Sequence, residues 1–395
     1  IMFILDESGG ITADHLTVDV GPTDVALRGS ATGWGDAAAH LEGTASSPDL
    51  SAALALAGLR GGGALAGNVT LDKDGETLAA DLDATLSKAS LGIPAIDGLL
   101  GPQTRVTLTA RRDADGLVTL EAAKVESPGV QLGASGTVSA RNELDLKIDA
   151  ALNDVSRVLP AAKGNIVANA HVLGPADNPH ADAAISNGTL HYDRFTLTGL
   201  KATVAATDLA TGPKAKIGLT GSLNDLPLSM ALDGAVDTAK NRITADGIKI
   251  ALGGTSVSGK AAWLGTAADG SLTLASTDLG EIGKLLGQDI HGVLDGQIAL
   301  SAPKGKQSAT VKARLKSLTA SGATAGAATV DASGTDLLGD DPGFNAALAA
   351  TQIKVAGESI DHLSAKAAGT LSTLNVSVDA SGPSGSVSTA ATVRA

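Results

Sequence analysis

The sequence contains no cysteine and very few aromatic residues. The absence of cysteine from all 395 residues excludes a disulfide framework and thiolate metal sites, and it is compatible with any compartment. Aromatic residues make up 2% of the chain although 43% of it is hydrophobic, so the apolar content is mostly Ala, Leu and Val. Such side chains bury little area per residue and do not supply the aromatic anchors of a compact core. The composition therefore favours a thin, extended structure over a large globular domain.

Long runs of one charge and long apolar runs are also missing. The 29 basic and 42 acidic residues give a net charge of −13 that is spread along the chain, which we interpret as a contribution to solubility. Without a basic patch or stacking aromatics, nucleic-acid binding is not expected. Residues 1–5 are apolar but too few for a signal sequence or a membrane span. Because the chain opens on an isoleucine within an expected strand, we expect it to be a piece of a longer protein.

What the sequence does contain is alternation of apolar and polar residues. In residues 143–150, four aliphatic residues alternate with four charged ones, and similar segments recur throughout, separated by turn signals such as Asp113–Gly116. Sustained helical periodicity is almost absent. The pattern predicts an all-β fold, namely a long, curled, mostly antiparallel meandering sheet with a few short helices. At one strand and turn per ~10–12 residues, it would hold roughly 30–35 strands.

An internal repeat organises these strands. Residues 129–172 read as strand, turn, strand, short helix and strand, and the same order recurs over residues 255–300. Equivalent positions are 124 residues apart for Asp154 and Asp278, and 123 apart for Gly136 and Gly259. We therefore predict one elongated array over residues 1–395. Its approximate repeats cover residues 16–125, 126–250 and 251–375, with a partial repeat at 376–395.

The alternation leaves one continuous apolar face, for which two interpretations remain open. The face is either a packed core, as in a folded ribbon or a β-helix, or an incompletely filled hydrophobic groove that holds a guest molecule. Small residues at many inward positions favour the groove, because a packed core does not tolerate the space they leave. The predicted groove lining comprises Leu16, Val18, Val20, Val106, Leu108, Leu144, Leu146, Ile148, Ile217, Leu219, Ile248, Ile250, Leu272, Leu274, Ile298, Leu300, Ile353 and Val355.

Two short helices are expected in the repeats, over residues 154–159 and 278–286. Each begins with an aspartate, which is a good N-cap, and continues with aliphatic residues at helical spacing. We predict that these helices cover the groove wall, and the alternative is that they act as a gate that contacts lipid. The covering residues are Val155, Val158, Leu159, Leu279, Ile282, Leu285 and Leu286.

Candidate catalytic and metal-binding residues are few. His180 and His191 lie near aspartates in the sequence, but their spacing matches no metal-binding pattern. Asp113 with Asp115, and Asp340 with Asp341, are interpreted as turn formers. The sequence has no Gly-x-Ser-x-Gly elbow between a strand and a helix, and Gly61–Gly63 lacks the Lys-Ser/Thr of a phosphate-binding loop. No catalytic residue, metal site or cofactor is predicted, and an enzyme is the least favoured class.

Several motifs resemble the TamB and AsmA-like proteins of Gram-negative bacteria. They are the order of alternating strands and Asp-Leu/Val-x-x-Leu helices, the segment Leu223–Leu232, and the strand pair near residues 197–202. The resemblance covers most of the chain. It implies a periplasmic segment of an inner-membrane-anchored protein, whose taco-shaped β-sheet carries or shields phospholipid acyl chains between the two membranes.

The resemblance also implies an outer-membrane partner of the Omp85 type and a role in outer-membrane protein assembly. The family's anchor helix and C-terminal domain are not recognisable in this sequence, so the implied partner-binding regions lie outside this chain. The alternative function is a structural β-solenoid, such as an adhesin or autotransporter passenger, with a packed interior.

Overall fold

The computed structural model describes residues 2–5, 10–20, 23–32, 38–51, 55, 60–90, 92 and 94–394. The protein is all-β, with 73% of it in strands and 6% in helices, and its strands form open, antiparallel, meandering sheet. The fold class expected from the alternation is therefore confirmed. The chain divides into two compact units, residues 1–210 and residues 211–395, and each is described by itself.

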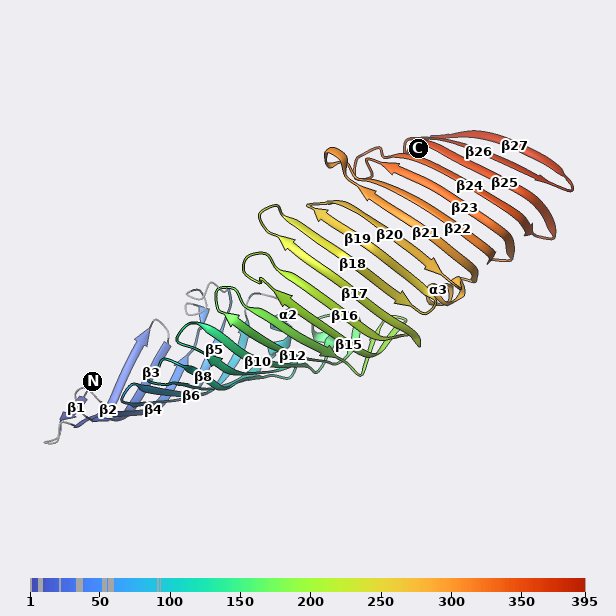
Figure 1. The fold of residues 1–395 in the computed structure, drawn as a ribbon. Helices are drawn as coiled ribbons and strands as arrows, with labels where there is room; N and C mark the ends of the chain where they lie inside the picture. The colour runs from blue at the N-terminus through green and yellow to red at the C-terminus, as the bar shows by residue number, and fades with distance from the viewer. Residues whose placement is uncertain are drawn as a thin grey trace. The chain divides into compact units, whose positions relative to one another are not determined.

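Unit 1 is a meander in which most strands pair with the next strand along the chain (Figure 1). The exception is a pair of short strands, β11 and β14, that pair with each other beside the continuous series β10, β12, β13 and β15. The strands are β1 (Met2–Leu5), β2 (Gly10–Val20), β3 (Thr23–Thr32), β4 (Ala38–Ser47), β5 (Gly62–Asp74), β6 (Thr77–Ser90), β7 (Gln103–Arg112), β8 (Val118–Glu126), β9 (Val130–Val138), β10 (Glu143–Leu152), β11 (Ala162–Gly164), β12 (Ile166–Pro175), β13 (His180–Ser186), β14 (Thr189–Tyr192) and β15 (Phe195–Thr207). Its helices are α2 (Pro94–Leu100) and the 3-10 turn η1 (Val155–Arg157).

Unit 2 is a meander in which every strand pairs with the next one along the chain. The strands are β16 (Lys214–Leu223), β17 (Leu226–Asp237), β18 (Arg242–Leu252), β19 (Thr255–Leu264), β20 (Ala267–Ser276), β21 (Ile290–Ser301), β22 (Ser308–Ala320), β23 (Ala323–Thr335), β24 (Gly343–Val355), β25 (Glu358–Thr370), β26 (Thr373–Gly382) and β27 (Gly385–Arg394). The helix α3 (Leu279–Leu286) lies at the end of the strands between β20 and β21, and the 3-10 turn η2 (Pro303–Gly305) joins β21 to β22 (Figure 1).

The strands are longer than the sequence analysis assumed. They reach 14 residues in β6 and 13 residues in β22 to β25. The expected number of strands was therefore too high. The physical reason is that many glycines lie inside strands rather than in turns. Gly259, for example, has a φ of +152° within β19, and a Cβ there would lie 2.0 Å from the backbone oxygen of Ser271 on β20.

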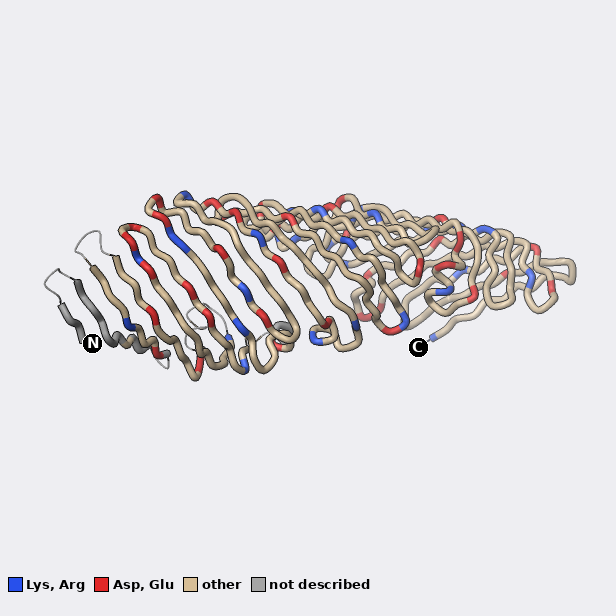
Figure 2. The backbone as a smooth tube through the Cα atoms, turned by 90° about the horizontal axis from the view of Figure 1, so that it is seen from below, with Lys and Arg blue, Asp and Glu red and all other residues tan. Residues whose placement is uncertain are grey.

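The two faces of each sheet differ in chemistry, as the alternation requires. In β10, Leu144, Leu146 and Ile148 are half-buried, whereas Asp145 and Lys147 are exposed on the opposite face. Figure 2 shows the positions of Lys, Arg, Asp and Glu residues distributed along the strands rather than gathered in one place. We call the side with the aliphatic residues the apolar face and the other side the polar face.

Cross-strand ion pairs occupy the polar face. Arg28 bonds Glu42 at 2.8 Å, and Arg105 bonds Asp83 through two nitrogen–oxygen contacts of 2.7 and 3.0 Å. Both pairs are well exposed to solvent, so each contributes little net stability. Their effect is to define register, because a shift of one residue would place these charges on the apolar face.

Candidate functional site

The candidate site is the apolar face, and most of the predicted lining residues share it. Leu16, Val18 and Val20 belong to β2, and their side chains lie outside the described residues. The register places thirteen of the other fifteen residues on one side of the sheet within each unit, and Ile353 and Val355 follow Gln352, whose φ of +53° interrupts the alternation of β24. Ile250 and Val355 are the more exposed, at 37% and 42%. The remaining thirteen are half-buried: Val106, Leu108, Leu144, Leu146, Ile148, Ile217, Leu219, Ile248, Leu272, Leu274, Ile298, Leu300 and Ile353.

The strand register joins these residues into continuous rows. In unit 2, Ile248 of β18 lies opposite Gly259 of β19, which lies opposite Leu272 of β20, and the same row then crosses every later strand. No charged residue occurs in it. The row continues through Ile298, Val311, Ala332, Ala346, Ala367, Val376 and Ala391.

Several apolar-face residues in these rows were not among the predicted lining. They follow the same period-2 pattern. Their strands were expected, but their inward residues were not assigned to the lining. Met230 and Leu232 of β17, Val330 of β23 and Leu348 of β24 are examples. The apolar face is thus more extensive than predicted.

The apolar face is incompletely covered among the described residues. The extensive backbone contacts of each strand are with its neighbours in the sheet. Fully buried residues on the face are mostly alanines, such as Ala245, Ala261, Ala328 and Ala350, each screened by larger neighbours. The larger aliphatic side chains stay partly open to solvent. The face is therefore not filled to the density of a protein core.

Helix α3 packs against β21 through glycines. Gly280 and Gly283 are buried, and an added Cβ would lie 2.4 Å from Nδ1 of His291 at the first and 2.6 Å from Cγ2 of Ile290 at the second. Glu281 accepts a hydrogen bond of 2.6 Å from the amide of Gly254, which connects the helix to the turn between β18 and β19. The close approach of helix and strand explains why a glycine pair is needed here.

The predicted N-caps of the two helical segments are present. Asp278 accepts a hydrogen bond of 2.8 Å from the amide of Gly280, and Asp154 accepts one of 2.9 Å from the amide of Ser156. In both cases hydrogen bonds to the ionised carboxylate, chiefly from the residues just named, lower the pKa of the aspartate below its usual range. Both helices are thus capped while the side chains of Asp154 and Asp278 are ionised.

The residues predicted to cover the groove wall differ in burial. Val155 and Leu285 are buried, and Leu279 and Ile282 are half-buried. The structure corrects the other three positions, since Val158, Leu159 and Leu286 are exposed at 40%, 47% and 54%. Val158 and Leu159 follow the end of η1, which is only three residues long. Leu286 is exposed because α3 approaches β21 with its glycines rather than with its whole aliphatic ridge.

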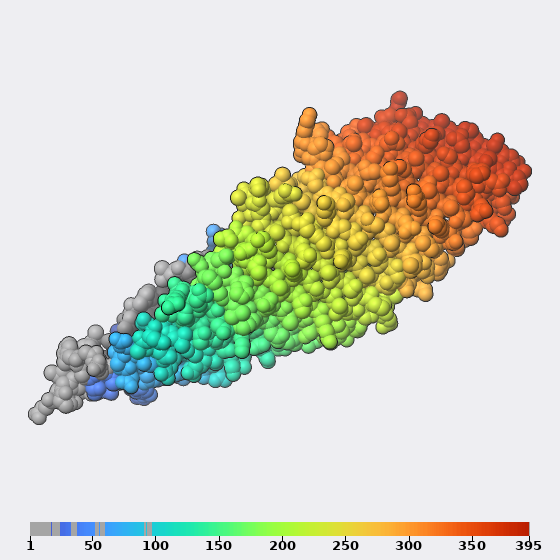
Figure 3. Space-filling model, viewed as in Figure 1, coloured from blue at the N-terminus to red at the C-terminus, as the bar shows by residue number. Residues whose placement is uncertain are grey.

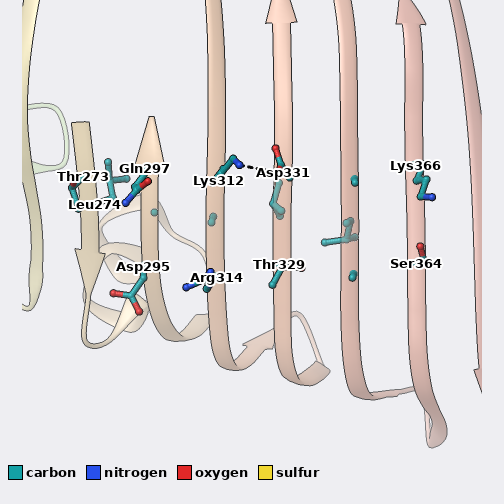
Figure 4. Close-up of a pocket in the computed structure, with 16 residues that line it drawn as sticks. Thr273, Leu274, Asp295, Gln297, Lys312, Arg314, Thr329, Asp331, Ser364 and Lys366 are labelled. Atoms are coloured by element: carbon teal, nitrogen blue, oxygen red, sulfur yellow. Dashed lines mark ion pairs between the residues drawn. The ribbon is translucent and has the colours of Figure 1, made fainter. Parts of the chain in front are cut away.

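Two open hollows among the described residues lie on the polar face. In unit 2 an open hollow of about 630 Å³ is bordered by two rows of polar-face residues that cross β20 to β25 (Figure 4). Asp295, Arg314 and Lys366 border it, and Lys312 pairs with Asp331 at 3.4 Å. Charges of both signs therefore face the same hollow, which gives it no preference for an anion or a cation.

In unit 1 a hollow on the polar face contains His40 and Asp72. His40 Nδ1 lies 2.5 Å from a carboxylate oxygen of Asp72, and this hydrogen bond, with the attraction between the two charges, raises the pKa of His40 above 6.5. Because the pKa of His40 is raised by folding, its pair with Asp72 stabilises the fold at pH values below the pKa of His40 in the unfolded state. That contribution is lost as the pH rises through the folded-state pKa.

We expect NMR titration of the imidazole signals to show His40 titrating above pH 6.5. Asp72→Asn removes the main cause and should return the pKa to its ordinary value. Glu42→Gln is the matched control, because Glu42 acts on His40 only as a more distant charge and should lower the pKa less. An unchanged pKa in Asp72→Asn would contradict this assignment.

The remaining polar candidates take part in turns or in local hydrogen bonds. Asp113 closes a hairpin turn, with the Gly116 amide donating to its carbonyl at 2.9 Å, and Asp341 accepts a hydrogen bond of 2.9 Å from the amide of Ser372. His191 lies 3.1 Å from the hydroxyl of Thr196. Across the described ranges, no group of three His, Cys, Asp or Glu residues is placed to hold a metal ion. The turn interpretation of Asp113 and Asp341 is confirmed.

The comparisons with known proteins leave the family undetermined. No protein-family model matches the chain, and no curated protein matches it. Within the described residues, no helix has both the length and the apolar character needed to cross a bilayer. What the fold defines is a class, an all-β protein built as an antiparallel meander with one aliphatic and one charged face.

Proposed function

We propose that the apolar face holds the acyl chains of phospholipid and that the protein is a non-enzymatic segment of a lipid conduit. The observation that carries this proposal is the set of uncharged aliphatic rows that cross consecutive strands and whose larger side chains stay partly open to solvent. Each CH₂ group exposed to water costs about 0.8 kcal/mol, so a ~16-carbon chain costs on the order of 12 kcal/mol. An aliphatic face removes much of that cost.

The uniformity of the rows supports movement along the face as well as binding. Successive strands present Leu272, Ile298 and Val311 at equivalent positions, and neither an aromatic nor a charged residue interrupts that row. An acyl chain would therefore meet similar contacts at each step. Equal contacts give no deep energetic trap, which is what sliding along a conduit requires.

A packed β-solenoid, as in an adhesin or autotransporter passenger, is the second candidate. Such a solenoid stacks parallel coils and fills its interior with side chains. Here the described pairings in both units are antiparallel, and large aliphatic residues of the apolar face remain partly exposed. These observations favour the acyl-chain proposal over the packed interior.

The resemblance to TamB and AsmA-like proteins extends the proposal to a cellular setting. In that setting the segment lies in the periplasm as part of an inner-membrane-anchored protein, carries phospholipid between inner and outer membrane, and supports outer-membrane protein assembly with an Omp85-type partner. Regions outside this chain would bind that partner. The argument from the apolar face does not depend on this setting.

The direct test is mass spectrometry of the protein purified from a Gram-negative host. We expect phospholipid to co-purify through gel filtration and to be released by organic solvent. The same measurement on an unrelated acidic β-protein purified in parallel controls for adventitious lipid. A lipid-free preparation that also fails to take up a fluorescent fatty acid would overturn the proposal.

A further inference from the structure

One edge of unit 2 presents leucines at its turns. Leu264 ends β19, Leu338 lies in the loop between β23 and β24, and Leu371 lies in the turn between β25 and β26. Their exposed fractions are 58%, 63% and 62%, among the highest of the large hydrophobic residues described. Turns of a soluble sheet ordinarily carry polar residues, so three exposed leucines on one edge require an explanation.

We call this edge the leucine rim and define it as segments 264–269, 302–307, 336–342 and 371–372. The segment 302–307, which contains η2, projects from the edge as an orange knob in Figure 3. The leucine rim is opposite the edge that carries α3, because consecutive turns of a meander alternate between the two edges of the sheet.

Hydrogen bonds connect the first two segments of the leucine rim. Gln307 is buried, with 8% of it exposed. Its side chain accepts a hydrogen bond of 2.7 Å from the Ala268 amide and donates to the Ala268 carbonyl at 3.1 Å. The amide of Ala302 donates to Asp269 at 2.9 Å. Backbone groups at these strand ends are therefore satisfied by the neighbouring segment.

The other segments are connected in the same way. The Leu337 amide donates to the Gln307 carbonyl at 2.8 Å, and the Leu371 amide donates to the Pro342 carbonyl at 3.1 Å. The Ser372 amide donates to Asp341 at 2.9 Å. The leucines thus project from a row of turns whose backbone amides already have partners.

The two aromatic residues of unit 2 lie beside the leucine rim. Trp263 and Phe344 are on the apolar face close to this edge, and they are 41% and 38% exposed. Tryptophan and phenylalanine beside exposed leucines are typical of surfaces that enter the interface of a lipid bilayer.

We propose that the leucine rim docks onto the surface of a phospholipid bilayer. Two features favour a bilayer over a compact protein partner. The apolar side chains follow a line of turns along one edge of the sheet, which suits an extended apolar boundary. The turn amides named above are bonded to protein groups, so water can be removed from them without leaving donors unpaired.

The charges of the leucine rim indicate whether it docks onto an anionic or a zwitterionic bilayer. The rim carries two lysines, Lys304 and Lys306, and four aspartates, Asp269, Asp336, Asp340 and Asp341, so it is slightly acidic. Lys306 is paired with Asp336. An acidic rim gains nothing from an anionic surface, so docking depends on apolar contact and should occur on zwitterionic vesicles. Such binding is insensitive to salt, because salt screens only charges.

The test is flotation of the full chain with phosphatidylcholine vesicles. The rim variant combines Leu264→Asp, Leu338→Asp and Leu371→Asp. The matched control combines Leu286→Asp, Val293→Asp and Val387→Asp, which are exposed at 54%, 37% and 66% near the opposite edge. We expect the rim variant to lose at least about tenfold in vesicle binding and the control to stay close to wild type.

Circular dichroism and gel filtration establish that both triple variants are folded. Flotation of wild type should persist in 0.5 M salt, because salt screens charge–charge interactions and leaves apolar contacts in place. Equal flotation of rim variant and wild type overturns the proposal, as does equal loss in the control. Wild-type self-association that the rim variant lacks, without flotation, would instead make the rim an interface between copies.

Docking of the leucine rim and acyl-chain binding on the apolar face can be disrupted by different substitutions. The rim variant leaves the aliphatic rows intact, so it should still bind a fluorescent fatty acid. Leu272→Asp places a charge in a row on the apolar face while leaving the rim leucines in place, so it should still float with vesicles. A variant that loses both activities together would contradict two separate surfaces.

Discussion

Replacing Ile148 by aspartate is expected to reduce acyl-chain binding at β10 by at least about tenfold. Ile148 is half-buried on the apolar face, opposite Ala134 of β9 and Ala170 of β12. Its small neighbours cannot screen a carboxylate from an acyl chain. Bringing hydrocarbon against an ionised group removes water from that group without supplying a hydrogen bond, and this is strongly unfavourable.

The measurement is site-specific crosslinking of a photoreactive phospholipid at β10, together with fluorescent fatty-acid titration of the whole chain. Lys147→Asp is the matched control, because it introduces the same side chain on the same strand but on the exposed polar face. Leu146→Arg tests the neighbouring apolar-face position of β10 with the opposite charge. If Ile148→Asp and Lys147→Asp bind lipid equally well, the apolar face of β10 is not the binding surface.

Stability should fall much less than binding in these variants. Each strand contacts mainly its two neighbours, so a local defect affects neighbouring strands and leaves distant ones in place. We expect circular dichroism of Ile148→Asp to remain close to that of wild type. Loss of the β-signal in parallel with lipid binding would mean that the residue supports the fold rather than the ligand.

The second large effect is expected for Gln307→Leu, which should destabilise the ends of β20 to β22 by about 2–4 kcal/mol. The buried amide of Gln307 makes four hydrogen bonds, to the amide and carbonyl of Ala268 and to the carbonyls of Ser301 and Ser308. Leucine has similar volume but no donor or acceptor. The partners at Ala268 would be left without their bonds in a place that water reaches poorly.

Native-state hydrogen exchange is the appropriate measurement, because local openings in a repeat sheet need not follow the global unfolding. Amides near residues 268, 301 and 308 should lose protection in Gln307→Leu. Gln297→Leu is the control, since Gln297 is exposed on the polar face of β21 and should change stability by no more than about 0.5 kcal/mol. Equal protection in the two variants would show that the Gln307 bonds contribute nothing.

The strands and their two faces were predictable because their signal is local. In residues 143–150 every second residue is aliphatic, and a strand has a side-chain period of two, so those residues must share a face. The same argument found most of the lining in unit 2. It underestimated strand length, because glycines such as Gly259 lie within strands rather than at their ends.

The packing of α3 was only half predictable. The aspartate N-cap and the helical spacing are local, and both were found from the sequence. The contact surface was not, because Leu279, Ile282 and Leu286 form the obvious aliphatic ridge, whereas Gly280 and Gly283 make the close contact. A glycine contact is defined by the neighbour that approaches it, here His291 and Ile290, and that neighbour is known only from the fold.

The sequence by itself determined the all-β class, the aliphatic and charged faces, and the positions of the helix caps, because each depends on residues within a few positions of one another. Only the tertiary structure decided which residues meet across strands. Gln307 bonds Ala268 from 39 residues away, and Asp341 bonds Ser372 from 31 residues away. Register and turn-to-turn hydrogen bonds place Leu264, Leu338 and Leu371 on one edge, and no local pattern contains that information.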